Sequence, residues 1–187
     1  MIEISIEQTR YLAAWVVAAC GLFGGTDAKA DERQCTGRIG AVSLNNVLVP
    51  DGASCVLDRT RMKGILVVAR GARVQATSVA IEGNLQAASV ALGGSSTVGG
   101  SVQIAQGGAA SIERARINGD LQLGSNTGPL SARRNQIGGN LQATQNRGGA
   151  QVIGNTMKGN QQCKENAPAP TGSGNRASSK EDQCARL

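Results

Sequence analysis

The strongest constraint on the fold is a tetrapeptide, Gly-polar-apolar-Gln, that recurs along the chain. It occupies residues 83–86, 100–103, 119–122 and 139–142, and a degenerate copy follows at 159–162. Successive glycines are 17, 19, 20 and 20 residues apart, and residues 64–67 and 45–48 fill the same place upstream. Seven copies therefore cover about residues 42–175. Self-similarity at this period predicts stacked units, each of which buries its apolar face against the next.

Each copy alternates apolar and polar residues around its glycine, the pattern of a strand with one buried face. The apolar residue two places before the glycine is Met62, Ile81, Val98, Ile117, Ile137 or Met157. The one two places after it is Val47, Leu66, Leu85, Val102, Leu121 or Leu141, and four places after it stand Val49, Val68, Ala87, Ile104, Leu123, Ala143 and Cys163. Seven places after it, turn residues dominate, including Asn126, Asn146 and Asn166, with Val90 as the exception.

A strong strand, a turn and one or two shorter strands in about 20 residues make one coil of a β-solenoid. The only three aromatic residues are Tyr11, Trp15 and Phe23, so everything beyond them must form its core from aliphatic side chains. A narrow coil interior filled by stacked Val, Ile, Leu and Ala satisfies that requirement. The chain lacks the leucine and asparagine framework of leucine-rich repeats. Helical repeats are disfavoured because glycine-rich units of this kind form helices poorly. We predict an all-β, single-stranded, right-handed parallel β-helix of about seven coils of roughly 20 residues.

These uneven coils resemble the right-handed parallel β-helix of the pectate-lyase-like superfamily over about residues 36–175. The Gly-Asn-Leu-Gln repeats, together with the closing segments at 162–166 and 181–184, look like a family of small exported bacterial β-helix proteins of unassigned role. The resemblance implies an architecture and an export route, and it implies no mechanism.

The N-terminal segment has the features of an export signal. Residues 12–23 are an apolar run of 12, too short to span a bilayer but long enough for a signal-peptide core. Ala28-Lys29-Ala30 then offers a leader-peptidase site, although Glu3 and Glu7 offset the charge of Arg10. The alternative is a lipoprotein signal that ends at Cys20. The expected organisation is a signal peptide over 1–30, an N-terminal cap over 31–41, the β-helix over 42–175 and a C-terminal cap over 176–187, with no transmembrane segment.

The remaining cysteines predict two disulfides in an oxidising compartment, periplasmic or extracellular. Cys35 and Cys55 are 20 residues apart, and Cys163 and Cys184 are 21 apart. One coil separates the members of each pair, and adjacent coils lie about 4.8 Å apart, within reach of a disulfide. The expected pairs are therefore Cys35–Cys55 and Cys163–Cys184, which would staple the two ends.

Two polar columns on the main strand are candidates for a glycan-facing surface. The first is Asn84, Ser101, Asp120, Asn140 and Asn160, and the second is Gln86, Gln103, Gln122, Gln142 and Gln162. Regularly spaced amides can hydrogen-bond the hydroxyls of an extended glycan. Stacked amides can equally bond one another along the axis and stabilise the sheet, as in cross-β assemblies. Both interpretations stand at this point.

Basic residues before the main strand form a possible anion-binding stripe. They are Arg59, Arg61, Arg114, Arg116, Arg133 and Arg134. Without residues 1–30 the chain keeps 17 of its 19 basic groups and 10 of its 13 acidic groups, a net charge of +7. An envelope glycan or another anionic polymer is a suitable partner for such a surface. Nucleic acid is not expected, because the repeats offer no aromatic side chain on which bases could stack.

Catalysis is not expected, and neither are cofactors or metals. The chain has no histidine, which is the most frequent general base. The repeats hold only six carboxylates, and no two of them share a column in adjacent coils. The sequence thus predicts an exported, non-catalytic β-helix protein that serves as a structural or binding module of the cell envelope or extracellular space. The alternatives are a polysaccharide-binding or polysaccharide-active β-helix, such as a lyase or hydrolase, and an end-to-end polymer that resembles bactofilins.

Overall fold

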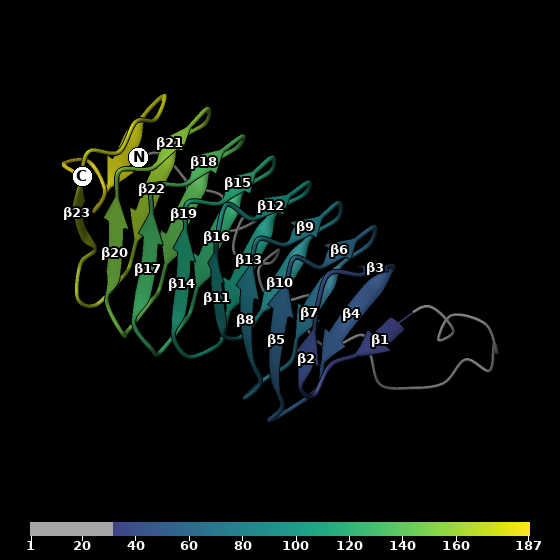
Figure 1. Cartoon of the computed structure of the whole chain (residues 1–187). Coiled ribbons are helices and arrows are strands. Elements are labelled where there is room, and N and C mark those ends of the chain that lie inside the picture. The colour runs from purple at the N-terminus through teal and green to yellow at the C-terminus, as the bar shows by residue number, and fades with distance from the viewer. Residues whose placement is uncertain (1–31) are drawn as a thin grey trace, which may run out of the picture. The chain divides into compact units, whose positions relative to one another are not determined.

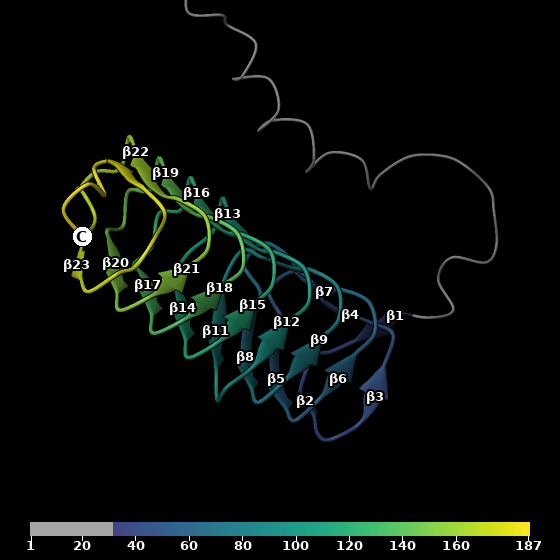
Figure 2. The ribbon, with the colours of Figure 1, turned by 90° about the horizontal axis from the view of Figure 1, so that it is seen from above.

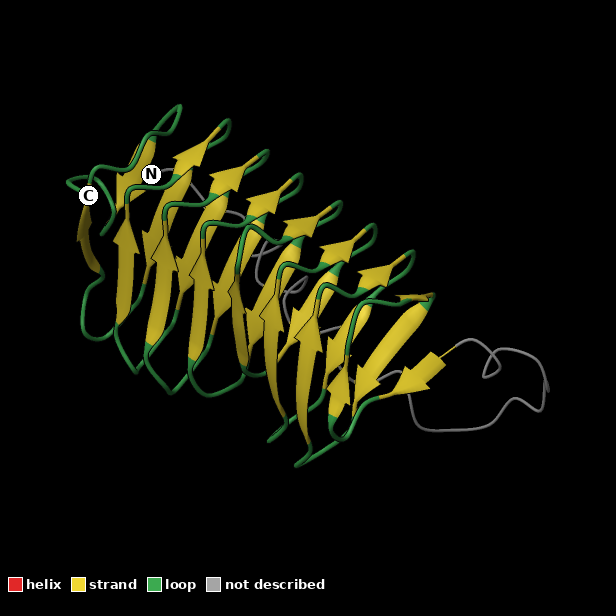
Figure 3. Ribbon diagram, in the orientation of Figure 1, coloured by secondary structure: helices red, strands yellow, loops and turns green. Residues whose placement is uncertain are grey.

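A computed structural model describes residues 32–187, and the predicted leader with Cys20 lies outside this part. Residues 32–187 form an all-β parallel solenoid of about eight turns, with no helix among them (Figures 1 and 3). The predicted fold class is thus confirmed. The turn count exceeds seven because both segments expected to be caps supply strands of their own.

Three parallel sheets run along the solenoid. In the central part of the solenoid, every coil contributes one strand to each sheet. Sheet A consists of β1 (Glu32–Gln34), β4 (Asn46–Val49), β7 (Leu66–Val68), β10 (Leu85–Ala87), β13 (Val102–Ala105), β16 (Leu121–Gly124), β19 (Leu141–Thr144), β22 (Gln161–Lys164) and β24 (Lys180–Asp182). Sheet B consists of β2 (Arg38–Ile39), β5 (Ser54–Asp58), β8 (Arg73–Thr77), β11 (Val90–Gly93), β14 (Ala110–Glu113), β17 (Leu130–Arg133), β20 (Ala150–Ile153) and β23 (Thr171–Ser173). Sheet C consists of β3 (Ser43–Leu44), β6 (Arg61–Met62), β9 (Ala80–Ile81), β12 (Thr97–Val98), β15 (Arg116–Ile117), β18 (Gln136–Ile137) and β21 (Thr156–Met157). Figure 2 shows the successive strands of sheets A and C following one another in two rows.

The turn between sheets A and B absorbs most of the differences in coil length. It is 69–72 after β7 and 106–109 after β13, but only Ala88 and Ser89 join β10 to β11. This short turn explains why Val90 interrupts the column of turn residues, because Val90 begins a strand. Leu85 still pairs with Val102, so the register of sheet A is unaffected.

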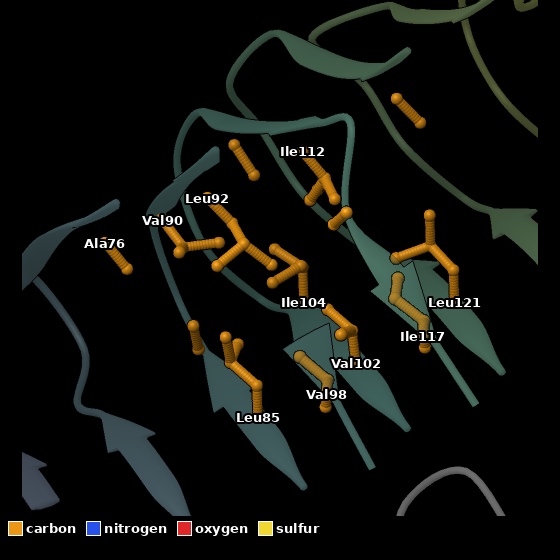
Figure 4. Packing of buried hydrophobic residues seen from close by; sticks show 14 of the residues in the cluster. Ala76, Leu85, Val90, Leu92, Val98, Val102, Ile104, Ile112, Ile117 and Leu121 are labelled. Atoms are coloured by element: carbon orange, nitrogen blue, oxygen red, sulfur yellow. The ribbon is translucent and has the colours of Figure 1, made fainter. Parts of the chain in front are cut away.

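The core is a set of aliphatic stacks that run along the inside of the solenoid (Figure 4). Leu85, Val102 and Leu121 occupy equivalent places on consecutive strands of sheet A, and each is fully buried. Sheet C supplies a second stack that includes Val98 and Ile117. Burial of an aliphatic side chain contributes about 1.5–3 kcal/mol, so these stacks stabilise the coils without aromatic rings.

The two predicted disulfides are present, one near each end. The Cα atoms are 5.6 Å apart in Cys35–Cys55 and 5.1 Å apart in Cys163–Cys184. All four cysteines are buried in the core. Both pairs therefore join neighbouring coils, as the period of the repeat requires.

Candidate functional site

The outer surface of sheet A carries the two predicted polar columns, and the first of them is engaged in bonding between coils. The amide oxygen Oδ1 of Asn84 accepts the backbone N–H of Ser101 at 2.8 Å, and Oγ of Ser101 accepts that of Asp120 at 3.0 Å. Oδ1 of Asp120 accepts the N–H of Asn140 at 2.7 Å, and Oδ1 of Asn140 accepts that of Asn160 at 2.8 Å. The first four side chains of this column thus accept a backbone N–H of the next coil, whereas Nδ2 of Asn160, the last, donates to Oε1 of Glu181 at 3.2 Å.

The repeated glycine makes room for this bonding. A Cβ atom on Gly139 would lie 2.1 Å from Oδ1 of Asp120, and one on Gly159 would lie 2.2 Å from Oδ1 of Asn140. No real Cβ atom occupies such a position. The Gly-polar pair of the repeat is therefore a unit: the glycine of one coil leaves space for the polar side chain of the coil before it.

The second column lies two residues further along each strand and has a different environment. Gln86, Gln103, Gln122 and Gln142 are in register with one another across four strands. Gln86 is exposed and the other three are partly exposed, and within residues 32–187 their side-chain amides form no hydrogen bond. Only Gln162 is engaged, because its Nε2 donates to Oε2 of Glu181 at 3.3 Å. This surface, defined by Gln86, Gln103, Gln122 and Gln142, is called the glutamine column below.

The turn asparagines Asn126, Asn146 and Asn166 form a buried ladder at the corner between sheets A and B. Nδ2 of Asn146 donates to Oδ1 of Asn166 and to the carbonyl oxygen of Leu123, both at 2.9 Å. Nδ2 and the backbone N–H of Asn126 both donate to Oδ1 of Asn146 at 3.0 Å. Gln183 ends the ladder by accepting the backbone N–H of Asn166 at 2.9 Å. These asparagines are structural.

A second buried ladder, Asn135, Asn155 and Asn175, lies at the corner between sheets B and C and was not predicted. Nδ2 of Asn135 donates to Oδ1 of Asn155, and Nδ2 of Asn155 donates to Oδ1 of Asn175. The sequence signal that could have revealed this ladder is the spacing of 20 residues between its asparagines. It is weak in the sequence because earlier coils have residues such as Thr60 and Ala115 at this corner.

The predicted arginine stripe is divided among three positions. Arg59, Arg114 and Arg134 sit at the corner before sheet C, each with φ near +54°. Arg61 and Arg116 begin strands of sheet C and point outward. Arg133 ends β17 on sheet B, where its guanidinium bonds Oε1 of Gln151.

Carboxylates neutralise most of the corner arginines. Oδ2 of Asp58 lies 3.1 Å from Arg38 and 3.5 Å from Arg59. Oε1 of Glu113 lies 3.5 Å from Arg114 and 4.0 Å from Arg134. Such exposed pairs contribute about 0–1 kcal/mol each to stability. Arg61 and Arg116 take part in no ion pair within residues 32–187.

The carboxylates of the repeats are occupied or scattered. Asp120 bonds the backbone of the next coil, and Oε2 of Glu165 accepts from Nε2 of Gln145 at 2.8 Å. Residues 32–187 contain no cluster of three or more His, Cys, Asp or Glu side chains that could hold a metal ion, and no helix in that part is long and apolar enough to cross a membrane.

Comparison of the chain with protein-family models, with curated proteins and with solved structures gives no match. The two disulfides point to an oxidising, non-cytoplasmic environment.

Proposed function

We propose that the protein is an exported, non-catalytic module of the cell envelope or extracellular space, and that its glutamine column binds an extended glycan. The observation that carries this proposal is the contrast between the two columns on sheet A. In the Asn84 column the side chains bond the backbone, whereas the amides of the glutamine column have no hydrogen-bond partner within residues 32–187.

The geometry of the glutamine column suits a linear polymer. Each glutamine is one strand away from the next, and adjacent strands are about 4.8 Å apart, so four amides span roughly 15 Å along the solenoid axis. An amide group both donates and accepts, and a sugar hydroxyl does the same. Flanking residues on this face are small, as at Ala105 and Gly124, so the polymer can approach the amides closely.

Export is supported by the predicted leader over 1–30 and by the two disulfides. We also infer that the solenoid is a right-handed β-helix of the pectate-lyase-like type, because connections between parallel strands of one sheet are right-handed in nearly all proteins. In such a module the β-helix acts as a rigid support for the binding face.

A glycan array followed by titration calorimetry tests the proposal on the purified, oxidised protein. The informative variant is Gln103→Ala/Gln122→Ala, which removes two central amides and leaves the Asn84 column intact. The matched control is Gln75→Ala/Gln136→Ala, which removes two exposed glutamines from sheets B and C.

We expect saturable binding of at least one linear glycan, a loss of about tenfold or more in affinity for the sheet A variant, and unchanged affinity for the control. Equal affinity of the two variants would show that the glutamine column is not the binding surface. An array without any bound glycan would refute the proposal.

Sedimentation of the same sample addresses the polymer alternative. At the C-terminal end, Gln183 ends the asparagine ladder, Cys184 is buried in the core and Leu187 packs against it. This closure favours a monomer, and a concentration-dependent series of longer species would instead support end-to-end assembly.

A further inference from the structure

A hollow lies at the corner between sheets B and C, in the first four coils. It has a volume of about 500 Å³, and its lining includes Arg59, Arg61, Ser78, Ser95 and Thr97. This corner hollow is separate from the glutamine column, which lies on sheet A. Two of its ten lining residues are arginines, and no carboxylate of residues 32–187 lines it.

The hollow exists because small residues interrupt two arginine positions. Along sheet C, Arg61, Ala80, Thr97 and Arg116 follow one another in register. Ala80 and Thr97 thus form a floor between two long side chains. Three strand spacings separate Arg61 from Arg116, which is about 14 Å. Of these two arginines, Arg61 lines the hollow.

The donors around the hollow are not equally available. Arg61 is exposed and has no ion pair within residues 32–187, so its guanidinium is free to bind an anion. Arg59 lies 3.5 Å from Asp58, but Asp58 also contacts Arg38 at 3.1 Å, so one carboxylate faces two guanidinium groups. The hydroxyl of Ser78 donates to the carbonyl oxygen of Gly94 at 2.7 Å and is already used.

Ser95 and Thr97 complete the set with hydroxyls that make no hydrogen bond in the described part of the chain. Two guanidinium groups and two hydroxyls offer more hydrogen-bond donors than the two oxygens of a ligand carboxylate can accept in a single orientation. A phosphate or sulfate ester matches them better, because it carries three acceptor oxygens around one centre. The volume is also several times that of such an anion, and Val42, which is 49% exposed, borders it. A sugar ring attached to the anion would fill the remaining space.

We propose that the corner hollow binds a phosphate or sulfate monoester carried on a sugar, with Arg61 as its principal anion-binding residue. This site does not depend on the glutamine column. The two proposals fail separately, because different residues on different sheets carry them.

Calorimetry and amide chemical-shift mapping with small probes test the site. The probes are glucose 6-phosphate, glucose 6-sulfate, glucuronate, glucose and inorganic phosphate. We expect both esters to bind, with shift changes concentrated in residues 41–43, 59–61, 78–80 and 95–97. We expect glucuronate and inorganic phosphate to bind at least about fivefold more weakly, and glucose not to bind.

Two variants distinguish the hollow from general positive charge. Arg61→Ala should lower the affinity for the esters by about tenfold or more, and Thr97→Trp should lower it similarly while retaining every arginine. The matched control is Arg73→Ala, which removes an exposed arginine from sheet B. Thermal unfolding of each variant confirms that it is folded before its affinity is interpreted.

Equal losses in Arg61→Ala and Arg73→Ala would overturn the proposal in favour of non-specific attraction. Unchanged affinity in Thr97→Trp would show that the ligand does not occupy the hollow. Glucuronate binding as tightly as the esters would refute the assignment to a tetrahedral anion, and shifts confined to other residues would refute the location.

Discussion

Replacing Asn146 by alanine should destabilise the protein far more than the small change in side-chain size suggests. Asn146 is fully buried, and its side chain makes four hydrogen bonds, to Leu123, to Asn166 and twice to Asn126. Alanine would leave the backbone N–H of Asn126 without its acceptor and take a donor from the carbonyl of Leu123. Each buried polar group left unsatisfied costs about 1–3 kcal/mol, so the two groups together give a loss of roughly 2–6 kcal/mol.

Asn140→Ala is the matched control, because it makes the same chemical change six residues away in the same coil. Its Oδ1 also accepts a backbone N–H, that of Asn160 at 2.8 Å, but this bond lies at the surface. Water can replace the lost acceptor there, so the expected cost is about 1 kcal/mol or less. Equilibrium urea unfolding, followed by circular dichroism, measures both values. Equal costs in the two variants, or a cost below about 1 kcal/mol for Asn146→Ala, would refute the reasoning.

Three further predictions concern the repeat and its C-terminal end. Gly139→Ala should destabilise by about 1–3 kcal/mol because its Cβ would overlap a neighbouring carboxylate oxygen, whereas Gly124→Ala, with nothing within 4 Å, should be nearly neutral in the same urea assay. Gln161→Leu should stabilise by about 1–2 kcal/mol, seen as a higher melting temperature, because Oε1 of Gln161 is buried with no hydrogen-bond partner among residues 32–187; an unchanged or lower value would contradict this. Replacing Cys163 and Cys184 together by alanine should cost about 3 kcal/mol through loss of a crosslink over about 20 residues, and a cost near zero in chemical unfolding would count against that estimate.

The period of the chain made the fold and the disulfides predictable. A one-coil repeat requires residues about 20 positions apart to be neighbours, so Leu121 must lie beside Leu141, and Cys163 must lie within reach of Cys184. Variation in coil length did not disturb this inference, because the turns between strands absorb it, mostly the one between sheets A and B.

The roles of the polar columns were not predictable from the same pattern. Asn84 and Gln86 are two residues apart and repeat equally well, yet only Asn84 reaches the backbone of the next coil. The difference depends on side-chain length and on the neighbouring glycine, which are matters of packing. The corner hollow was hidden for another reason: it depends on two successive coils having small residues where the coils before and after them have arginine. These small residues are Ser78, Ala80, Ser95 and Thr97.

Methyl–methyl nuclear Overhauser effects in the isotope-labelled protein would test the stacking of equivalent residues most directly. Leu121 is in register with Val102 on one side and Leu141 on the other. We expect strong effects for both of these pairs, whose strands are about 4.8 Å apart, and none between Val102 and Leu141, whose strands are about 10 Å apart. Absence of the effect between Leu121 and Leu141, with both methyl groups assigned, would contradict the solenoid and every surface built on it.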